Sequence, residues 1–189
     1  MPSISNKGNL MPESPIRKLV PYAEKAKKKG IKVFHLNIGQ PDVETPKSAL
    51  KAVKNADIKV LAYSKSEGDL NLREKISDYY SRHNVEISSS DIIITSGASE
   101  ALLFTIGSIM DSMDEIIIPE PFYANYNGFS AANGVNIVPV SSSIDDNFSL
   151  PKIDDFESLI SSKTKAILIC NPNNPTGYVY SESEIKRLI

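Results

Sequence analysis

Short apolar runs alternate along the chain with segments whose apolar residues recur at helical spacing. The apolar runs predict β-strands at residues 33–36, 92–94, 115–118, 136–140 and 166–170. The helical spacing predicts helices near residues 70–82, 98–111, 122–133 and 153–160, with a last helix after Ser181. Such alternation is typical of a parallel sheet with helices on both faces. We therefore predict an α/β fold with a mostly parallel sheet.

The N-terminal part of the chain predicts an arm followed by one helix. Residues 1–13 lack apolar periodicity, and Ser14-Pro15 then offers an N-cap and a proline at the first helical position. Gly30 is placed to end this helix in the left-handed conformation. Four lysines stand just before Gly30, where positive charge complements the helix dipole.

Composition and charge argue against several classes of function. A net charge of -2 gives no electrostatic reason to expect nucleic acid or an anionic membrane as a partner. One cysteine and two histidines make a Cys/His metal cluster improbable, and Cys170 is predicted to be a buried strand residue rather than a nucleophile. No apolar run is long enough to span a membrane, and the N-terminus lacks a signal-peptide core. We therefore expect a cytoplasmic protein.

Two loops that follow predicted strands carry groups suited to a ligand. Residues 95–99 form a turn of small residues before a helix, where free backbone N–H groups make an anion site. The alternative interpretation is a serine-capped turn without a ligand. Residues 171–177 contain two Asn-Pro steps, which fix a turn at the carboxyl end of the sheet, where α/β proteins bind ligands. Here too a rigid turn without a ligand is the alternative.

Two further segments at strand ends carry weaker signals. Past the strand at 115–118, Tyr123 or Tyr126 is placed to stack on a planar ligand, whereas Phe122 is expected to pack the following helix onto the sheet. Gly39 follows the first predicted strand. Its lack of a side chain either lets a ligand approach the backbone or serves only the turn.

In their order along the chain, these segments resemble the fold-type I aminotransferases, the family that includes aspartate aminotransferase. The resemblance extends from about Ser14 to the end of the sequence. The matching motifs are Asn-Ile-Gly-Gln-Pro-Asp at 37–42, Tyr63-Ser64 with Gly68 and Leu72-Arg73-Glu74, Ser-Gly-Ala-Ser-Glu-Ala-Leu at 96–102, Pro121-Phe122-Tyr123, and Asn-Pro-Asn-Asn-Pro-Thr-Gly at 171–177.

The resemblance implies pyridoxal 5'-phosphate as the cofactor and assigns residues to it. The loop Gly97, Ala98 and Ser99 would hold the cofactor phosphate through backbone N–H groups. Tyr123 would stack on the pyridine ring. Asn174 would donate a hydrogen bond to the phenolic oxygen of the cofactor and help to keep that oxygen ionised.

The resemblance also implies substrates, an assembly and a division into domains. Amino acids and 2-oxo acids would exchange an amino group in amino acid metabolism and biosynthesis, with the backbone N–H of Gly39 directed at the substrate carboxylate. Tyr63 would reach the cofactor phosphate of a neighbouring subunit, which implies a homodimer. Residues 1–45 would form the arm, helix and strand of a small domain, and residues 46–189 the large cofactor-binding domain.

Three residues of the family pattern lie after the Asn-Pro-Thr-Gly turn: the Schiff-base lysine, the aspartate at the pyridine nitrogen and an arginine for the substrate carboxylate. The sequence stops at Ile189 within a helical pattern. We therefore expect an N-terminal half whose catalytic residues lie beyond Ile189, and which alone is inactive and poorly soluble. Lys65 superficially matches the lysine signature, but it precedes the phosphate loop, so we expect it to be solvated. Arg73 is expected to open the helix near Leu70.

Other functions compete with transamination on the same residues. A carbon–sulfur lyase or a decarboxylase would use the same cofactor and scaffold, and fold-level analogy does not separate them. A truncated product without catalysis, acting as a dimerisation or binding module, is a further alternative. A doubly wound nucleotide-binding domain is disfavoured because no Gly-x-Gly-x-x-Gly follows the first predicted strand.

Overall fold

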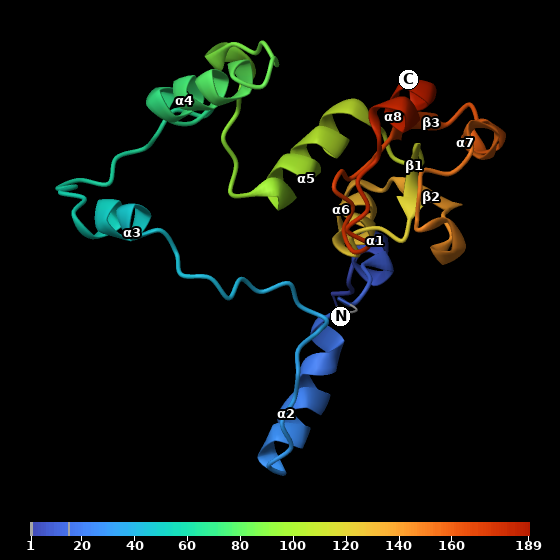
Figure 1. Cartoon of the computed structure of the whole chain (residues 1–189), viewed down its shortest axis with the longest axis horizontal. Helices are drawn as coiled ribbons and strands as arrows, with labels where there is room; N and C mark the ends of the chain where they lie inside the picture. Colours follow the sequence, from blue (N-terminus) through green and yellow to red (C-terminus); the bar gives the residue numbers. More distant parts are fainter. Residues whose placement is uncertain (1, 15) are drawn as a thin grey trace. The chain divides into compact units, whose positions relative to one another are not determined.

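The structure is a computed structural model that describes residues 2–14 and 16–189. The chain divides into two compact units. The first unit contains the N-terminal residues up to Ile31 together with Ala98–Ile189, and the second is Lys32–Gly97 (Figure 1). The proline predicted at the first helical position, Pro15, lies outside the described residues.

The first unit contains a parallel three-stranded sheet. Its strands are β1 (Glu115–Glu120), β2 (Asn136–Ser141) and β3 (Thr164–Ile167), in the order β2-β1-β3. Both neighbours pair with β1 in parallel. The central position of β1 explains why four consecutive residues of this strand are buried, because it is covered on both faces and along both edges.

Helices cover both faces of this sheet, which confirms the predicted α/β fold. Ile116 and Ile118 of β1 belong to one buried cluster and Ile117 to another, as the period of two along a strand requires. Burying each isoleucine contributes roughly 1.5–3 kcal/mol. The first cluster includes residues of α5 (Ala98–Ile109) and α6 (Asn125–Asn133). The second includes Phe156 of α7 (Ile153–Leu159), and residues of α8 (Glu182–Leu188) pack against it.

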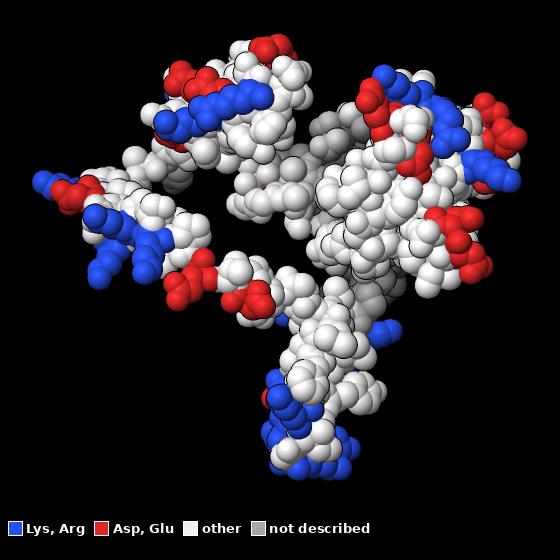
Figure 2. Space-filling view, viewed as in Figure 1, with Lys and Arg blue, Asp and Glu red and all other residues white. Residues whose placement is uncertain are grey.

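The N-terminal part of the first unit consists of short elements: α1 (Asn6–Leu10), the 3-10 turn Arg17–Leu19 and α2 (Val20–Lys28). Ser14 caps the turn, because its hydroxyl accepts a hydrogen bond from the Arg17 N–H at 3.2 Å. Gly30 follows α2 with φ of 76°, as predicted for a left-handed helix end. Basic side chains gather at the end of α2, as Figure 2 shows, where they face the negative end of the helix dipole.

The second unit is built from α3 (Lys47–Lys54), α4 (Leu70–Ser81) and the 3-10 turn Ser89–Asp91. Arg73, in the first turn of α4, is 5% exposed. Its guanidinium donates to the Ser89 carbonyl at 2.7 Å and approaches the Glu67 carboxylate at 3.4 Å. The Glu67 carbonyl in turn accepts from the Ile94 N–H at 3.0 Å. Arg73 therefore fastens the segment before α4 to the segment that leads towards Gly97.

Several predicted elements differ from the structure. Residues 33–36 and 92–94 are irregular rather than strands, because an apolar run becomes a strand only when it pairs with a neighbour. The strand predicted at 166–170 ends at Ile167. The helix predicted at 122–133 begins at Asn125. The sequence pattern missed α1, α3 and the 3-10 turn Ile144–Asp146.

Candidate active site

The carboxyl ends of β1 and β3 lie at one edge of the sheet, because these neighbouring strands are parallel. The pairing continues past β3, where the Leu168 N–H donates to the Ile117 carbonyl at 2.9 Å. The segments that follow the two strands are also joined directly: the side-chain amide of Asn173 donates to the Pro121 carbonyl at 3.1 Å. The predicted aromatic segment and the Asn-Pro turn therefore meet at this edge.

The first half of α5 lies near the same edge of the first unit. Helix α5 ends at Ile109, a few residues before β1 begins, and packs back along the sheet. Leu103, in the second turn of α5, lines a pocket together with Ala124 and Asn125, which follow the carboxyl end of β1. The first half of α5 therefore lies beside the segment that leaves this end of β1. Ala98 and Ser99 are exposed there. A helix leaves its first N–H groups without intrahelical partners, which suits them to bind an anion.

Gly97, which precedes α5, has a backbone conformation that favours glycine. Its φ is 82°, and no other atom lies within 4 Å of the position where a Cβ would stand. The Gly97 N–H donates to the Thr95 carbonyl at 2.8 Å, which closes a tight turn just before the helix. The turn thus brings the chain into α5 without placing a side chain over its first residues.

Tyr123 and Tyr126, both candidates to face a ligand, have different environments. Tyr126 is 8% exposed within the cluster around Ile116 and Ile118. Burial raises the pKa of the Tyr126 hydroxyl above its ordinary range, and the neighbouring Cys170 thiol adds to this effect. Tyr123 is half-buried in the connection before α6. Tyr126 is therefore a core residue, and Tyr123 is the tyrosine of this segment that is partly accessible at the edge.

Local contacts fix the orientation of the Tyr123 side chain. Its ring packs edge-to-face on Tyr126, with centroids 5.5 Å apart and an interplanar angle of 88°. Its hydroxyl accepts a hydrogen bond from the Asn125 side-chain amide at 2.7 Å. These two contacts hold the ring at the end of β1.

The three asparagines of the Asn-Pro turn differ in their hydrogen bonds and in their exposure. The Asn171 side-chain oxygen accepts from the Tyr180 N–H at 2.9 Å. Asn173 donates through its side chain to the Thr176 hydroxyl at 2.9 Å, and its carbonyl accepts from the Gly177 N–H at 2.8 Å. Asn171 and Asn173 thus hold the turn, whereas Asn174 is exposed. The sequence predicted a fixed turn but did not show which asparagine fixes it.

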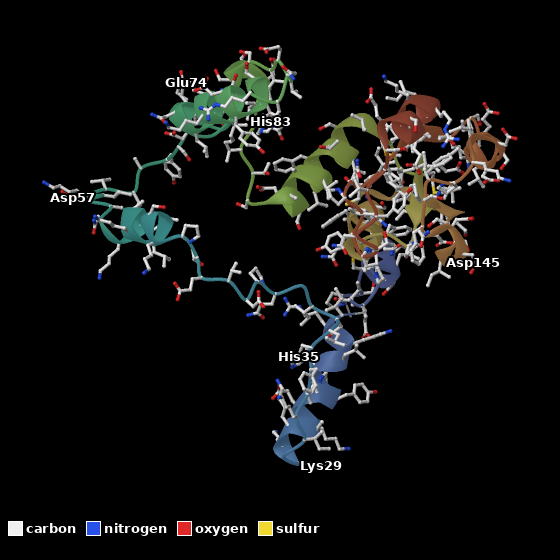
Figure 3. All side chains as sticks on the ribbon, viewed as in Figure 1. Lys29, His35, Asp57, Glu74, His83 and Asp145 are labelled. Carbon is white, nitrogen blue, oxygen red and sulfur yellow. The ribbon has the colours of Figure 1, made fainter. Side chains whose placement is uncertain are left out.

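The prediction that Cys170 is a buried strand residue was wrong. Cys170 is half-buried and follows the end of β3, and its thiol donates to the Pro172 carbonyl at 3.3 Å. In the described part of the chain, no group of three or more His, Cys, Asp or Glu side chains could hold a metal ion. The two histidines, His35 and His83, lie on different segments (Figure 3).

The remaining candidates, Gly39 and Tyr63, belong to the Lys32–Gly97 unit. Gly39 is exposed, its φ lies outside the left-handed region, and nothing lies within 4 Å of the position of a Cβ. The Tyr63 side chain is fully exposed. Lys65 is also exposed, as predicted. Gly39 and Tyr63 are therefore both accessible to a ligand or a partner.

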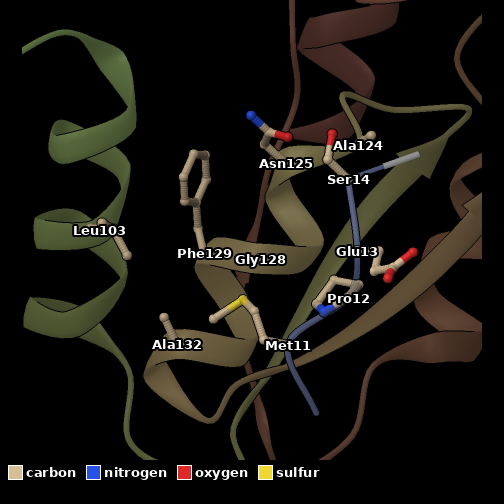
Figure 4. Close-up of a pocket in the computed structure, with 10 residues that line it drawn as sticks. All are labelled: Met11, Pro12, Glu13, Ser14, Leu103, Ala124, Asn125, Gly128, Phe129 and Ala132. Atoms are coloured by element: carbon tan, nitrogen blue, oxygen red, sulfur yellow. The ribbon is translucent and has the colours of Figure 1, made fainter. Parts of the chain in front are cut away.

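A pocket of about 290 Å³ lies within the first unit, between the N-terminal segment, Leu103 of α5 and one side of α6 (Figure 4). Most of its lining is apolar, including Met11, Pro12 and Phe129. Asn125 also lines it and donates to Tyr123, so this pocket neighbours the aromatic residue of the edge.

Comparison with known proteins identifies the family to which this chain belongs. The family model for aminotransferase class I and II matches residues 31–189. The chain therefore belongs to the class I and II aminotransferases.

Individual relatives agree with this assignment. The chain is 37% identical over 163 residues to a (5-formylfuran-3-yl)methyl phosphate transaminase of Methanocaldococcus jannaschii, covering 85% of this chain and 42% of the relative. It is 33% identical to an aspartate aminotransferase of Thermotoga maritima, covering 94% and 48%. An alanine aminotransferase structure from Pyrococcus furiosus is similar with a TM-score of 0.88 and 34% identity, covering 98% and 48%. The chain thus spans about half the length of these relatives.

Proposed function

We propose that the protein is a pyridoxal-phosphate-dependent aminotransferase that moves an amino group between an amino acid and a 2-oxo acid. The observation that carries this proposal is the contact between the Asn-Pro turn and the aromatic segment at the carboxyl end of the sheet, where the Asn173 side chain donates to the Pro121 carbonyl. Membership of the aminotransferase family supports it. When bound, pyridoxal phosphate supplies an electron sink for bonds at the α-carbon of an amino acid.

The residues of this edge fit the cofactor. The N–H groups of Ala98 and Ser99 would bind its phosphate, and the positive φ of Gly97 keeps the approach open. The Tyr123 ring would stack on the pyridine ring. Asn174 would donate its amide N–H to the phenolic oxygen, because its two neighbouring asparagines already hold the turn. A hydrogen bond to the ionised form of that oxygen favours the ionised form.

Substrate binding and assembly extend the proposal to the second unit. The backbone N–H of Gly39 would bind the substrate carboxylate. Tyr63 would reach the cofactor phosphate of the other subunit of a homodimer, a role for which its full exposure leaves the side chain available. We further propose that residues 1–45 belong to a small domain and residues 46–189 to a large one. The chemistry assigned to this sequence is binding and orientation, and no covalent step is assigned to it.

We also propose a role in amino acid biosynthesis and a cytoplasmic location, which subcellular fractionation tests. Among residues 2–14 and 16–189, no helix is long and apolar enough to cross a membrane. We propose no nucleic-acid partner, since a net charge of -2 gives no electrostatic reason to expect one.

The proposal is tested on the protein at its natural length, whose intact mass also shows whether residues follow Ile189. We expect the purified protein to carry a visible cofactor band that changes when an amino acid is added. Asn174→Ala should alter this band and lower the transamination rate by about tenfold, the loss of one hydrogen bond to a charged oxygen. Asn71→Ala, another exposed asparagine, is the matched control and should change neither.

The same assay separates the alternatives. An aminotransferase needs a 2-oxo acid acceptor for repeated turnover and forms a new amino acid from it. A carbon–sulfur lyase or a decarboxylase would turn over without the acceptor and release sulfide or carbon dioxide. Absence of any cofactor band and of amino transfer in the natural-length protein would overturn the proposed function.

A further inference from the structure

Glu184, the third residue of α8, is a buried carboxylate with several hydrogen-bond donors around it. Glu184 is 8% exposed. One oxygen, Oε2, accepts from the Ser181 N–H at 2.8 Å and from the Ser181 hydroxyl at 2.6 Å. The other, Oε1, accepts from the Leu150 N–H at 3.0 Å and from the Tyr178 hydroxyl at 3.2 Å. None of the ion pairs between described residues involves Glu184, so dipolar donors alone stabilise its charge.

These donors are more than helix capping needs. Ser181 and Glu184 alone form the capping box of α8. The other two donors come from elsewhere: Leu150 lies in the connection between β2 and α7, and Tyr178 follows the Asn-Pro turn. Hydrogen bonds from Ser181, above all from its hydroxyl, and further ones from Leu150 and Tyr178 lower the pKa of Glu184 to about 2. The carboxylate is therefore charged at neutral pH and joins three segments of the first unit.

A chain of hydrogen bonds leads from Tyr178 to the residues on either side of Asn174. The Tyr178 carbonyl accepts from the Asn173 N–H at 2.8 Å, and the Tyr178 N–H donates to the Thr176 hydroxyl at 3.2 Å. The same Thr176 hydroxyl accepts from the Asn173 side chain. Asn174 thus stands inside a closed ring of hydrogen bonds, and the Tyr178 hydroxyl ties this ring to Glu184.

We propose that Glu184 is a positioning residue for the cofactor: through Tyr178, its carboxylate holds the Asn-Pro turn in the geometry that presents the Asn174 amide to the phenolic oxygen. This inference rests on the proposed function, because the phenolic oxygen to which Asn174 would donate belongs to the cofactor. It adds a residue of α8, outside the turn itself, to those on which the protonation of the bound cofactor depends.

Two variants separate positioning from capping, because each removes one donor from the same carboxylate. Tyr178→Phe removes the hydroxyl that links Glu184 to the turn and leaves the capping box intact. Ser181→Ala removes the capping hydroxyl and leaves the link to Tyr178. Three quantities are measured in the protein at its natural length: the thermal midpoint, the dissociation constant of pyridoxal phosphate, and the pH midpoint of the visible band of the bound cofactor.

We expect both variants to lower the thermal midpoint, whereas only Tyr178→Phe should weaken cofactor binding, by about fivefold. Tyr178→Phe should also displace the pH midpoint of the band in the direction that Asn174→Ala displaces it. In the Asn174→Ala background, Tyr178→Phe should have no further effect on that midpoint, since both act on the same amide. Glu184→Gln keeps one acceptor oxygen, so its pH midpoint should lie between that of the unmodified protein and that of Tyr178→Phe.

The outcomes distinguish this inference from the proposed function. If the unmodified protein binds the cofactor and Tyr178→Phe behaves like Ser181→Ala, with the pH midpoint unchanged, Glu184 only caps α8 and the inference is wrong. Additive effects of Tyr178→Phe and Asn174→Ala on the midpoint would also overturn it. If the unmodified protein binds no cofactor, the proposed function fails and the inference fails with it.

Discussion

Gly97 and Gly39 differ at the residue scale in one respect that a substitution can measure. Both are exposed, and neither has an atom within 4 Å of the position of a Cβ. Gly97 has φ of 82°, whereas Gly39 lies outside the left-handed region. An added methyl group therefore meets free space at both positions, but the backbone conformation opposes it only at Gly97.

We expect Gly97→Ala to lower the free energy of unfolding by about 1 kcal/mol, because an L-residue is strained in the left-handed region. Gly39→Ala is the matched control and should leave stability unchanged. In the assay of activity, Gly39→Ala should raise KM, because the added methyl group stands beside the N–H that is proposed to bind the substrate carboxylate. Denaturant unfolding of both variants measures the first effect, and equal losses at the two positions would contradict the role given to φ.

The site could be predicted from the sequence at the level of segments, but not at the level of every side chain. The small-residue turn, the aromatic segment and the Asn-Pro turn were recognisable because each follows an apolar run. The sequence did not show that Asn173 holds the turn while Asn174 is exposed. The two residues are identical, and only the conformation of the turn sets the direction of each side chain. The choice between Tyr123 and Tyr126 stayed open and the burial of Cys170 was predicted wrongly, because burial depends on packing against distant segments.

Elements were predictable where they carry a complete local signal. Helices α4 and α5 and strands β1 and β2 have clear periodicity and lie close to their predicted positions. The runs at 33–36 and 92–94 are equally apolar but pair with no described strand, and a strand depends on its neighbours. Helix α1 contains Gly8 and Asn9, which are weak helix formers, so its local sequence favours no helix. Helix α3, with Ala49, Leu50 and Val53 at helical spacing, could have been found by the same periodicity.

The attachment of α8 should depend on pH through Glu184. Hydrogen bonding in the folded protein, first from the Ser181 hydroxyl, lowers the pKa of Glu184 from 4.5 to about 2. The folded state therefore binds this proton less readily than the unfolded state. The stabilisation is complete above pH 4.5 and is lost as the pH falls towards 2.

We expect Glu184→Gln to cost on the order of 2 kcal/mol at pH 6, where the native carboxylate is charged and accepts its hydrogen bonds. This difference from the unmodified protein should shrink as the pH falls towards 3. Glu182→Gln is the control, because Glu182 forms an ion pair with Lys186 while 81% exposed, and such a pair contributes little. Unfolding by urea at several pH values measures both variants, and a difference that stays constant with pH would contradict the assignment.

At the scale of the whole molecule, residues 36–63 expose an unusual amount of apolar surface. Six large apolar side chains in this segment have exposed fractions between 76% and 106%, namely Leu36, Val43, Val53, Val60, Leu61 and Tyr63. Contiguous exposed apolar surface is typical of a surface that packs against a partner or against another part of a protein. The sequence pattern does not reveal this, because a residue that packs within its chain and one that packs against a partner are equally apolar. The segment also contains Gly39 and Tyr63, which connects the uncovered surface with the proposed homodimer.

The homodimer and the role of Tyr63 can be tested together with mixed subunits. Tyr63→Ala and Asn174→Ala should each lower activity by about tenfold when present in both subunits, because each removes a hydrogen bond to a charged group of the cofactor. In a mixed dimer, the Tyr63→Ala subunit keeps Asn174 and receives Tyr63 from its partner, so one site of two is complete.

Mixed dimers isolated with two different tags should therefore recover roughly half of the unmodified activity, as the two-fold symmetry of such an interface requires. If Tyr63 instead serves the site of its own subunit, each site of the mixed dimer carries one defect and no activity returns. Dimers of each single variant, purified in the same way, are the control for exchange of subunits. A protein that stays monomeric at its natural length would exclude the shared site altogether.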